Sequence, residues 1–382
     1  MQFNQTKQIQ IQKTEVKNRI FGLDLLRVYA IFSIVYGHGW YLAAHFADTR
    51  YLSFKYESVT IFFTITGFLV GYKFLKFLES DSINIVTVRG FWLKRFIKIY
   101  PSYFLLLVLV GVFHIALGGA LPAGYLYLFT FTQNLISPHP SVYPELWSLA
   151  IQEWFYVLIP FIFIVYSRYQ NRNNPSQLII VVLSIIVAVT TWRIAKVLLM
   201  SPVDLQTWDI MLRKQVVTRL DSALYGFLVA YAMFKHPMAF KKYAYHALAL
   251  ALFLIYVDKD LFERFPFYRS YLNLSISTIG AALLIPYFYG LNINNAFVKN
   301  MITRLSAISL GMYILHLTPI MFVFIPYAMS ALQKLFPSSA YDFHILLYAA
   351  YWVLSIGLAH LLHHYFAKPM DVFLTRKFNH LL

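Results

Sequence analysis

The sequence contains no cysteine and few charged residues. The absence of cysteine from its 382 residues excludes disulfide bonds, thiolate metal sites and a cysteine nucleophile, and it leaves the redox compartment undetermined. Charged residues make up only 13% of the chain, whereas soluble domains usually carry about a quarter. Hydrophobic residues make up 59%, and the mean hydropathy is +0.60. This balance is typical of a polytopic membrane protein.

The chain has fewer acidic than basic residues. The chain has 16 Asp and Glu against 32 Lys and Arg, a formal net charge of +16. Such an excess can indicate nucleic-acid binding, but here the basic residues are scattered between apolar runs and form no basic domain. We therefore predict no nucleic-acid partner and explain the charge by membrane topology.

Apolar runs of about 20 residues, the length that crosses a bilayer, recur along the chain. The sequence thus predicts an all-α polytopic membrane protein with about ten transmembrane helices around a central cavity. A long loop is expected at 120–145, because it contains four prolines, with a short re-entrant or interfacial helix at 124–136. The expected spans are 23–45, 57–78, 101–119, 146–167, 177–199, 217–235, 242–257, 271–289, 304–325 and 343–366.

The distribution of Lys and Arg predicts the orientation. With both termini on one side, that side carries 20 of these residues in its loops and span ends, and the other side carries 8. The positive-inside rule then places both termini in the cytoplasm. We expect a cytoplasmic tail at 1–22, one membrane domain at 23–366 and a second tail at 367–382, in a plasma membrane, most simply the bacterial inner membrane.

The first span carries two ionisable residues on one face. In LRVYAIFSIVYGH (26–38), Arg27 and His38 are eleven residues apart, which is about three helical turns and about 16 Å along the axis. Arg27 can reach the cytoplasmic surface, but His38 lies about 10 Å below the outer edge. A buried ionisable residue is costly unless it faces protein or water, so this face should line a cavity. The alternative is a histidine bonded to a neighbouring helix.

The fourth span places a carboxylate at the depth of His38. Glu153 in PELWSLAIQEWFYVLIP (144–160) also lies about 10 Å below the outer edge, where it could orient the imidazole of a general base. The alternative is a salt bridge between Glu153 and an arginine of another helix. Trp147 and Tyr156 fit an interfacial aromatic belt and packing better than catalysis.

A basic turn precedes the third span. In RGFWLKRFIKIYPSYF (89–104), Lys94, Arg95 and Lys98 stand among aromatic residues, an arrangement suited to binding phosphates. Ordinary anchoring by cytoplasmic basic residues explains the same pattern.

Two further stretches carry polar groups inside or beside spans. Arg219 and Asp221 lie near the outer end of the sixth span, where they could bind an acceptor or could cap the helix and pair with each other. Tyr313 and His316 share a face of the ninth span at spacing i, i+3, and His316 is expected to line the same cavity.

Two motifs are better explained by structure than by chemistry. HLLHHY (360–365) has a metal-ligand spacing on a helix, but it lies at the cytoplasmic interface without an acidic third ligand, so no metal site is predicted. TITGF (64–68) contains Gly67, which we expect to permit close helix packing.

The quoted motifs, in their order, resemble those of the membrane-bound acyltransferase 3 family. The likeness covers nearly the whole chain. It implies a transfer of acyl groups, commonly acetyl, from acyl-coenzyme A to envelope sugars and other small acceptors. The fragments that carry it are LDLLRVYAIFSIVYGH, VTIFFTITGFLVGYKFLK, FWLKRFIKIYPSYF, LWSLAIQEWFYVLIP, RLDSALYGFLVAYA and SLGMYILHLTPI.

The resemblance implies roles for individual residues. Its arginine and histidine, with ten residues between them, fall on Arg27 and His38 and imply a catalytic histidine. We expect this histidine to act either as a base or as a carrier of the acyl group, oriented by Glu153. Its cytoplasmic pair of arginines is half kept, because Lys98 follows Arg95, and lysine lacks the bidentate fork. The expected donor-phosphate ligands are Arg27, Arg95 and Lys98, and the expected acceptor or substrate contacts are Trp147, Ser148, Tyr156, Arg219, Tyr313 and His316.

The predicted enzyme therefore uses acetyl-coenzyme A as a donor substrate, with no permanently bound cofactor. Its expected partners are a glycan or lipid-linked sugar acceptor and membrane lipids, while the oligomeric state stays open. The main alternative is a transporter or flippase for a lipid-linked sugar or small anion, against which stand the absence of an inverted repeat and the asymmetric placement of the charges. A purely structural membrane subunit would leave the polar face of the first span unexplained.

Overall fold

The computed structural model describes residues 19–44, 58–80, 83–116, 118–169, 176–200, 203–337 and 343–379. Within these ranges every regular element is helical, which confirms the predicted all-α class. The α-helices are α2 (Phe21–Ala43), α3 (Ser58–Glu79), α4 (Ile85–Ala116), α5 (Trp147–Tyr169), α6 (Ser176–Met200), α7 (Leu205–Trp208), α8 (Val216–Arg219), α9 (Asp221–Lys235), α10 (Pro237–Lys242), α11 (Ala244–Arg264), α12 (Pro266–Tyr271), α13 (Asn273–Gly290), α14 (Ala296–Leu315), α15 (Ile325–Leu335), α16 (His344–Leu361) and α17 (Lys368–Lys377). Short 3₁₀ or π segments are η1 (Tyr125–Thr130), η2 (Pro144–Leu146), η3 (Asp209–Arg213), η4 (His316–Phe324) and η5 (Leu362–Ala367).

Each of the ten predicted spans overlaps a helical stretch of the described chain, although the sixth covers α8 and α9, and the ninth and tenth continue from α14 into η4 and from α16 into η5. By length and composition alone, seven helical stretches of the described chain are long and apolar enough to cross a membrane. The protein is therefore a multi-pass membrane protein, and the count of ten spans stays a prediction.

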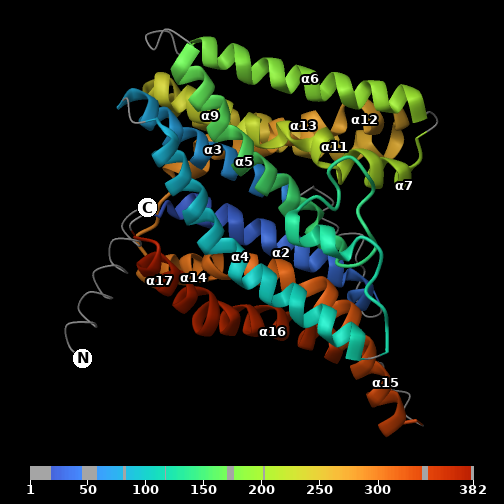
Figure 1. Ribbon diagram of the computed structural model, residues 1–382. Helices are drawn as coiled ribbons and strands as arrows, with labels where there is room; N and C mark the ends of the chain where they lie inside the picture. The colour runs from blue at the N-terminus through green and yellow to red at the C-terminus, as the bar shows by residue number, and fades with distance from the viewer. Residues whose placement is uncertain are drawn as a thin grey trace.

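The first helix, α2, lies in the middle of the bundle. It packs against α3 and α13 on one side and against α14 and α16 on the other, while α6 lies at the edge (Figure 1). Residues on α2 can therefore meet residues from both the N-terminal and the C-terminal parts of the chain. This position brings Arg27 to the interior of the bundle, whereas His38, near the end of α2, is exposed.

Two glycines allow α3 and α9 to pack closely against each other. A Cβ atom added at Gly67 would lie 1.7 Å from the carbonyl oxygen of Ala223, and one added at Gly226 would lie 2.0 Å from that of Thr64. Such approach of two backbones is possible only where side chains are missing. The predicted packing role of Gly67 is confirmed.

We expect Gly67→Ala to destabilise the protein by about 1–3 kcal/mol, because the new methyl group must push two backbones apart. A drop in the midpoint of thermal unfolding in detergent would show this. Gly357→Ala is the matched control, since a Cβ there meets nothing within 4 Å and alanine favours a helix. Equal midpoints for the two variants would contradict the packing argument.

The predicted basic turn is part of a helix rather than a loop. α4 runs without a break from Ile85 to Ala116 and contains Pro101, at which the sequence placed the start of the span. A proline usually ends or kinks a helix, but membrane helices tolerate it where neighbouring groups compensate for the lost hydrogen bond. Arg95 and Lys98 are consequently held on a helix instead of a mobile connection.

The predicted loop at 120–145 packs into the bundle. Only η1 and η2 are regular within it, so the expected helix at 124–136 is shorter than predicted. Its backbone is held by side chains of the helices: Tyr103 donates to the carbonyl of Leu128 at 2.8 Å, and Trp154 Nε1 donates to that of Phe131 at 3.0 Å. Asn134 of this segment donates to the carbonyl of Trp147 at 2.9 Å, which ties the segment to the start of α5.

Candidate active site

A polar cavity of about 200 Å³ lies among α2, α3, α4, α5 and α14. Its described lining contains no acidic residue but four cationic ones, namely Arg19, Arg27, Arg95 and Lys98. Ser148, Tyr156 and Tyr313 line it as well. Six of the residues predicted from sequence to bind donor or acceptor therefore meet in one cavity, although they come from four separate helices.

One end of the cavity is organised by Asp24. This buried carboxylate accepts hydrogen bonds from Ser306 Oγ at 2.7 Å and Arg27 Nη1 at 3.1 Å, and Arg19 Nε lies 3.7 Å away. Arg19 also donates to the carbonyl of Thr303 at 2.7 Å, which ties it to α14. A single carboxylate thus fixes two guanidinium groups beside the cavity without neutralising all of the positive charge.

The contribution of α4 to this basic end is Arg95 and Lys98. The Arg95 guanidinium lies 4.4 Å from the centre of the Tyr156 ring, a cation–π contact that orients it. Tyr156 is itself held, because its hydroxyl accepts from Gln152 Nε2 at 2.9 Å. Lys94, the third basic residue of the predicted turn, is exposed and does not line the cavity.

The other end of the cavity is formed by Ser148 and Tyr313. Tyr313 lies seven residues beyond Ser306 on α14, about 10 Å further along the axis. Its hydroxyl donates to the carbonyl of Glu145 at 2.6 Å, so the 2.7 Å bond between Ser148 and Tyr313 must use the serine proton. Glu145, which the sequence did not single out, is in turn held by the backbone and hydroxyl of Thr318 at 2.9 and 2.8 Å.

His316 lies just beyond this end and is bonded to His38. The ring centres of Tyr313 and His316 are 5.8 Å apart, and His316 Nε2 lies 2.8 Å from His38 Nδ1. His316 is fully buried, whereas His38 is exposed near the end of α2. The four cationic groups therefore line the cavity, while the histidine pair lies outside its lining, next to Tyr313.

The predicted contact between Glu153 and His38 is absent, and His316 takes its place. Among the residues that the structure describes, His38 has no hydrogen bond to Glu153, and Glu153 Oε1 is buried without a hydrogen-bond partner. The alternative, a salt bridge from Glu153 to an arginine, is not formed within the described chain either. Equal depth in the membrane did not make the two residues neighbours, because depth does not fix the direction in which each helix faces.

Two other predicted contact residues are buried in packing. Arg219 is completely buried, donates to Thr60 Oγ1 at 3.0 Å and lies over the Phe63 ring, so it is not placed to meet an acceptor. Trp147 is also buried and packs edge-on against Phe63 with the Arg213 guanidinium 4.8 Å from its ring centre. Trp147 is thus packed in the core, and its role as a substrate contact stays a prediction.

Asp221 pairs with Arg193, not with Arg219. Arg193 Nη1 and Nη2 each lie 2.9 Å from one oxygen of Asp221, and both side chains are at most 2% exposed. The sequence offered Arg219 as a partner only because it is close along the chain.

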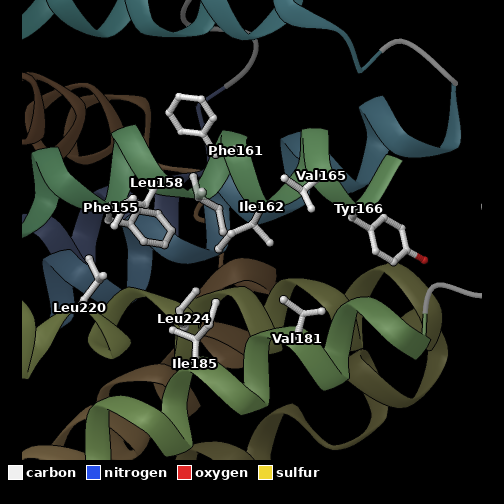
Figure 2. Close-up of a pocket in the computed structure, with 11 residues that line it drawn as sticks. Phe155, Leu158, Phe161, Ile162, Val165, Tyr166, Val181, Ile185, Leu220 and Leu224 are labelled. Atoms are coloured by element: carbon white, nitrogen blue, oxygen red, sulfur yellow. The ribbon is translucent and has the colours of Figure 1, made fainter. Parts of the chain in front are cut away.

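A second, larger hollow of about 430 Å³ lies between α5, α6 and the start of α9. Figure 2 shows Ile162 of α5 on one side of it and Val181 and Ile185 of α6 on the other, and apart from Tyr166 the lining side chains are aliphatic or phenyl groups. Without a group that can bind a phosphate or move a proton, this hollow is not the site of chemistry.

The histidines of HLLHHY do not build a metal site in the described chain. His360 and His364 stack with ring centres 6.0 Å apart, and the described residues contain no group of three histidine, aspartate or glutamate side chains placed to hold a metal ion.

Comparison with known proteins identifies the family. The family model described as an acyltransferase domain matches residues 20–364. The chain belongs to this acyltransferase family. No solved structure matches it.

Several bacterial relatives are partly similar to this family member. "Putative peptidoglycan O-acetyltransferase YrhL" of Bacillus subtilis is 30% identical over 42% of this chain and 26% of its own length. "Peptidoglycan O-acetyltransferase OatA" of Listeria monocytogenes is 24% identical over 45% of this chain and 28% of its own length. A Staphylococcus aureus protein named "Putative O-acetyltransferase SACOL0978" is 28% identical over 37% of this chain. The chain spans about a quarter of the length of these relatives.

Proposed function

We propose that this protein is an integral membrane O-acetyltransferase. It would move an acetyl group from acyl-coenzyme A on the cytoplasmic side to a hydroxyl of an envelope glycan on the other side. The observation that carries the proposal is the cavity with its four cationic groups, together with the His38–His316 pair that lies next to Tyr313 of its lining. The family supports an acyl transfer, and the names of two relatives favour peptidoglycan or a related glycan as the acceptor.

The basic end of the cavity suits the phosphates of coenzyme A. Arginine and lysine bind phosphate oxygens by charge-assisted hydrogen bonds, and arginine does so in a bidentate manner. The cavity of about 200 Å³ is smaller than the roughly 300–1,000 Å³ of a typical ligand pocket. We infer that it takes the thioester arm, while the nucleotide stays at the mouth beside Arg27, Arg95 and Lys98.

His38 would act as the general base. It is exposed, so an acceptor hydroxyl can reach it from the outer side. It is hydrogen-bonded to His316, whose ring lies next to that of Tyr313 in the cavity lining. By taking the hydroxyl proton it would raise the nucleophilicity of the oxygen that attacks the thioester carbonyl. The donor and the acceptor would then meet from opposite sides of the membrane.

Release of coenzyme A separates this proposal from a transporter. Purified protein in detergent would be given acetyl-coenzyme A with and without peptidoglycan fragments, and free thiol would be followed together with the mass of the glycan. We expect thiol release that depends on the acceptor and a matching gain of one acetyl group. A protein that binds both ligands but releases no thiol with a panel of envelope glycans would refute the transferase.

We expect Arg95→Gln and Lys98→Gln each to weaken acetyl-coenzyme A binding by about 10-fold to 100-fold, since a hydrogen bond to a charged group contributes about 1.5–3 kcal/mol. Calorimetric titration of each variant measures this. Lys94→Gln is the control, because it removes the same charge from the same helix outside the cavity. Equal weakening by all three variants would indicate a diffuse charge effect and not a phosphate site.

A further inference from the structure

The hydrogen bonds of His316 define which of its nitrogens carries a proton. His316 begins the π-helical segment η4, and its Nδ1 lies 3.0 Å from the carbonyl oxygen of Met312 and 2.8 Å from that of Tyr313. A carbonyl oxygen can only accept a hydrogen bond. His316 Nδ1 must therefore carry a hydrogen and donate it to the backbone.

The other nitrogen of His316 is then an acceptor. The ring is fully buried, and none of its hydrogen-bond partners is a carboxylate, so an imidazolium there would be a buried charge without a counter-ion. In the neutral ring Nε2 holds a lone pair, so it accepts the 2.8 Å hydrogen bond and His38 Nδ1 donates it. Ring centres 5.0 Å apart and planes 21° apart place the two imidazoles edge to edge, as this bond requires.

We propose that His316 is a positioning residue that holds His38 in the tautomer with hydrogen on Nδ1, leaving His38 Nε2 free to accept a proton from the acceptor hydroxyl. This inference rests on the proposed function, because it assigns the basic atom of that reaction. The nitrogen of a histidine that carries the proton is set by the hydrogen bond that the other nitrogen makes. Here the carbonyls of Met312 and Tyr313 fix the tautomer of His316, and the hydrogen bond to His316 fixes the tautomer of His38.

The reaction balances with this assignment. The acceptor oxygen forms a bond to the acyl carbon while its proton moves to His38 Nε2, and the carbon–sulfur bond breaks as the thiolate of coenzyme A leaves. The proton on Nε2 then passes to the thiolate, which restores neutral His38. The bond from His38 Nδ1 to His316 is kept throughout, so the ring does not turn between the two proton transfers.

His316 fills the place that a carboxylate has in serine proteases. There, a change that produces the wrong histidine tautomer lowers kcat about 10⁴-fold although the geometry is kept. A neutral imidazole can fix the tautomer and orientation in the same way, but it adds no negative charge beside the imidazolium. The effect of losing it should therefore lie at or below that magnitude.

The tautomer can be measured in the wild-type protein. Protein labelled with ¹⁵N-histidine would be studied by solid-state NMR, and the His38 signals would be identified by their loss in His38→Gln. We expect a protonated Nδ1 and an unprotonated Nε2 for His38. A protonated Nε2 in the neutral ring would overturn the proposal whatever the variants do.

Two variants of His316 test the kinetic consequence. In His316→Leu no side-chain acceptor is left, and we expect kcat to fall by about 10² or more with little change in the KM for acetyl-coenzyme A. In His316→Gln an amide oxygen can still accept from His38, so kcat should stay within about tenfold of the wild type. For each variant, the binding of acetyl-coenzyme A and the midpoint of thermal unfolding are measured to show that the protein is folded.

The outcomes separate this proposal from the transferase itself. Wild-type turnover by His316→Leu, or an equal loss in folded His316→Leu and His316→Gln, would overturn the positioning role while the enzyme remains a transferase. If the wild type releases no coenzyme A with any glycan, the proposed function fails, yet the NMR measurement still decides the tautomer.

Discussion

Purified His38→Ala is expected to release coenzyme A at least about 10²-fold more slowly than the wild type, and up to about 10⁴-fold, because this is the usual contribution of a general base. Donor binding should not change, since His38 does not line the cavity in which the basic residues lie. The loss should therefore appear in kcat. It is measured as thiol release with saturating acetyl-coenzyme A and a peptidoglycan acceptor.

The matched control for His38 is another exposed histidine. His360→Gln changes a ring that stacks on His364 and lies away from the cavity, so it should keep wild-type turnover. His38→Gln keeps polarity but cannot accept a proton at neutral pH, so it should be as slow as His38→Ala. If His38→Ala turns over at the wild-type rate, His38 is a packing residue and the mechanism is wrong, although the family assignment would stand.

Arg193→Met is expected to lower the free energy of unfolding by about 3–5 kcal/mol, because it leaves the Asp221 carboxylate buried without its partner. The variant also loses two further hydrogen bonds of this buried side chain, because Arg193 donates to the Thr218 carbonyl at 2.9 Å and to Ser275 Oγ at 2.7 Å. Unfolding in detergent, followed by temperature or by added SDS, measures the effect.

Removing both charges should cost much less than removing one. The double variant Arg193→Met with Asp221→Leu places two apolar side chains where an ion pair was, an exchange that is often nearly neutral. We expect it to recover most of the stability lost in Arg193→Met. A double variant less stable than either single one would show that each residue has contacts that matter more than their pairing.

The sequence by itself determined the class of the protein and where its helices lie. Apolar runs of the right length can be recognised without a partner, because a membrane span must satisfy its backbone internally. The shared face of Arg27 and His38 followed from helical geometry alone. Gly67 could be recognised as a close-packing residue because it interrupts an apolar run with a missing side chain.

Two local features were not predicted from the sequence: the continuation of α4 through Pro101 and the hydrogen bonds of Asp24. Pro101 predicted a helix start, yet α4 continues through it, since the neighbouring helices outweigh one lost hydrogen bond. Asp24 could have been found as a partner of Arg27, because the two are three residues apart on one helix. No comparable spacing points to Ser306, which is 282 residues away from Asp24.

The tertiary structure alone decided which residues touch. His38 and Glu153 share a depth, but the histidine turned out to face His316, 278 residues along the chain. Arg219 is two residues from Asp221, but Arg193 of another helix forms the ion pair. Composition and periodicity fix the depth and face of a side chain on its own helix, whereas the neighbour across the interface depends on how the helices pack and turn about their axes. That packing is set by the summed contacts of many side chains, so no single motif could reveal it.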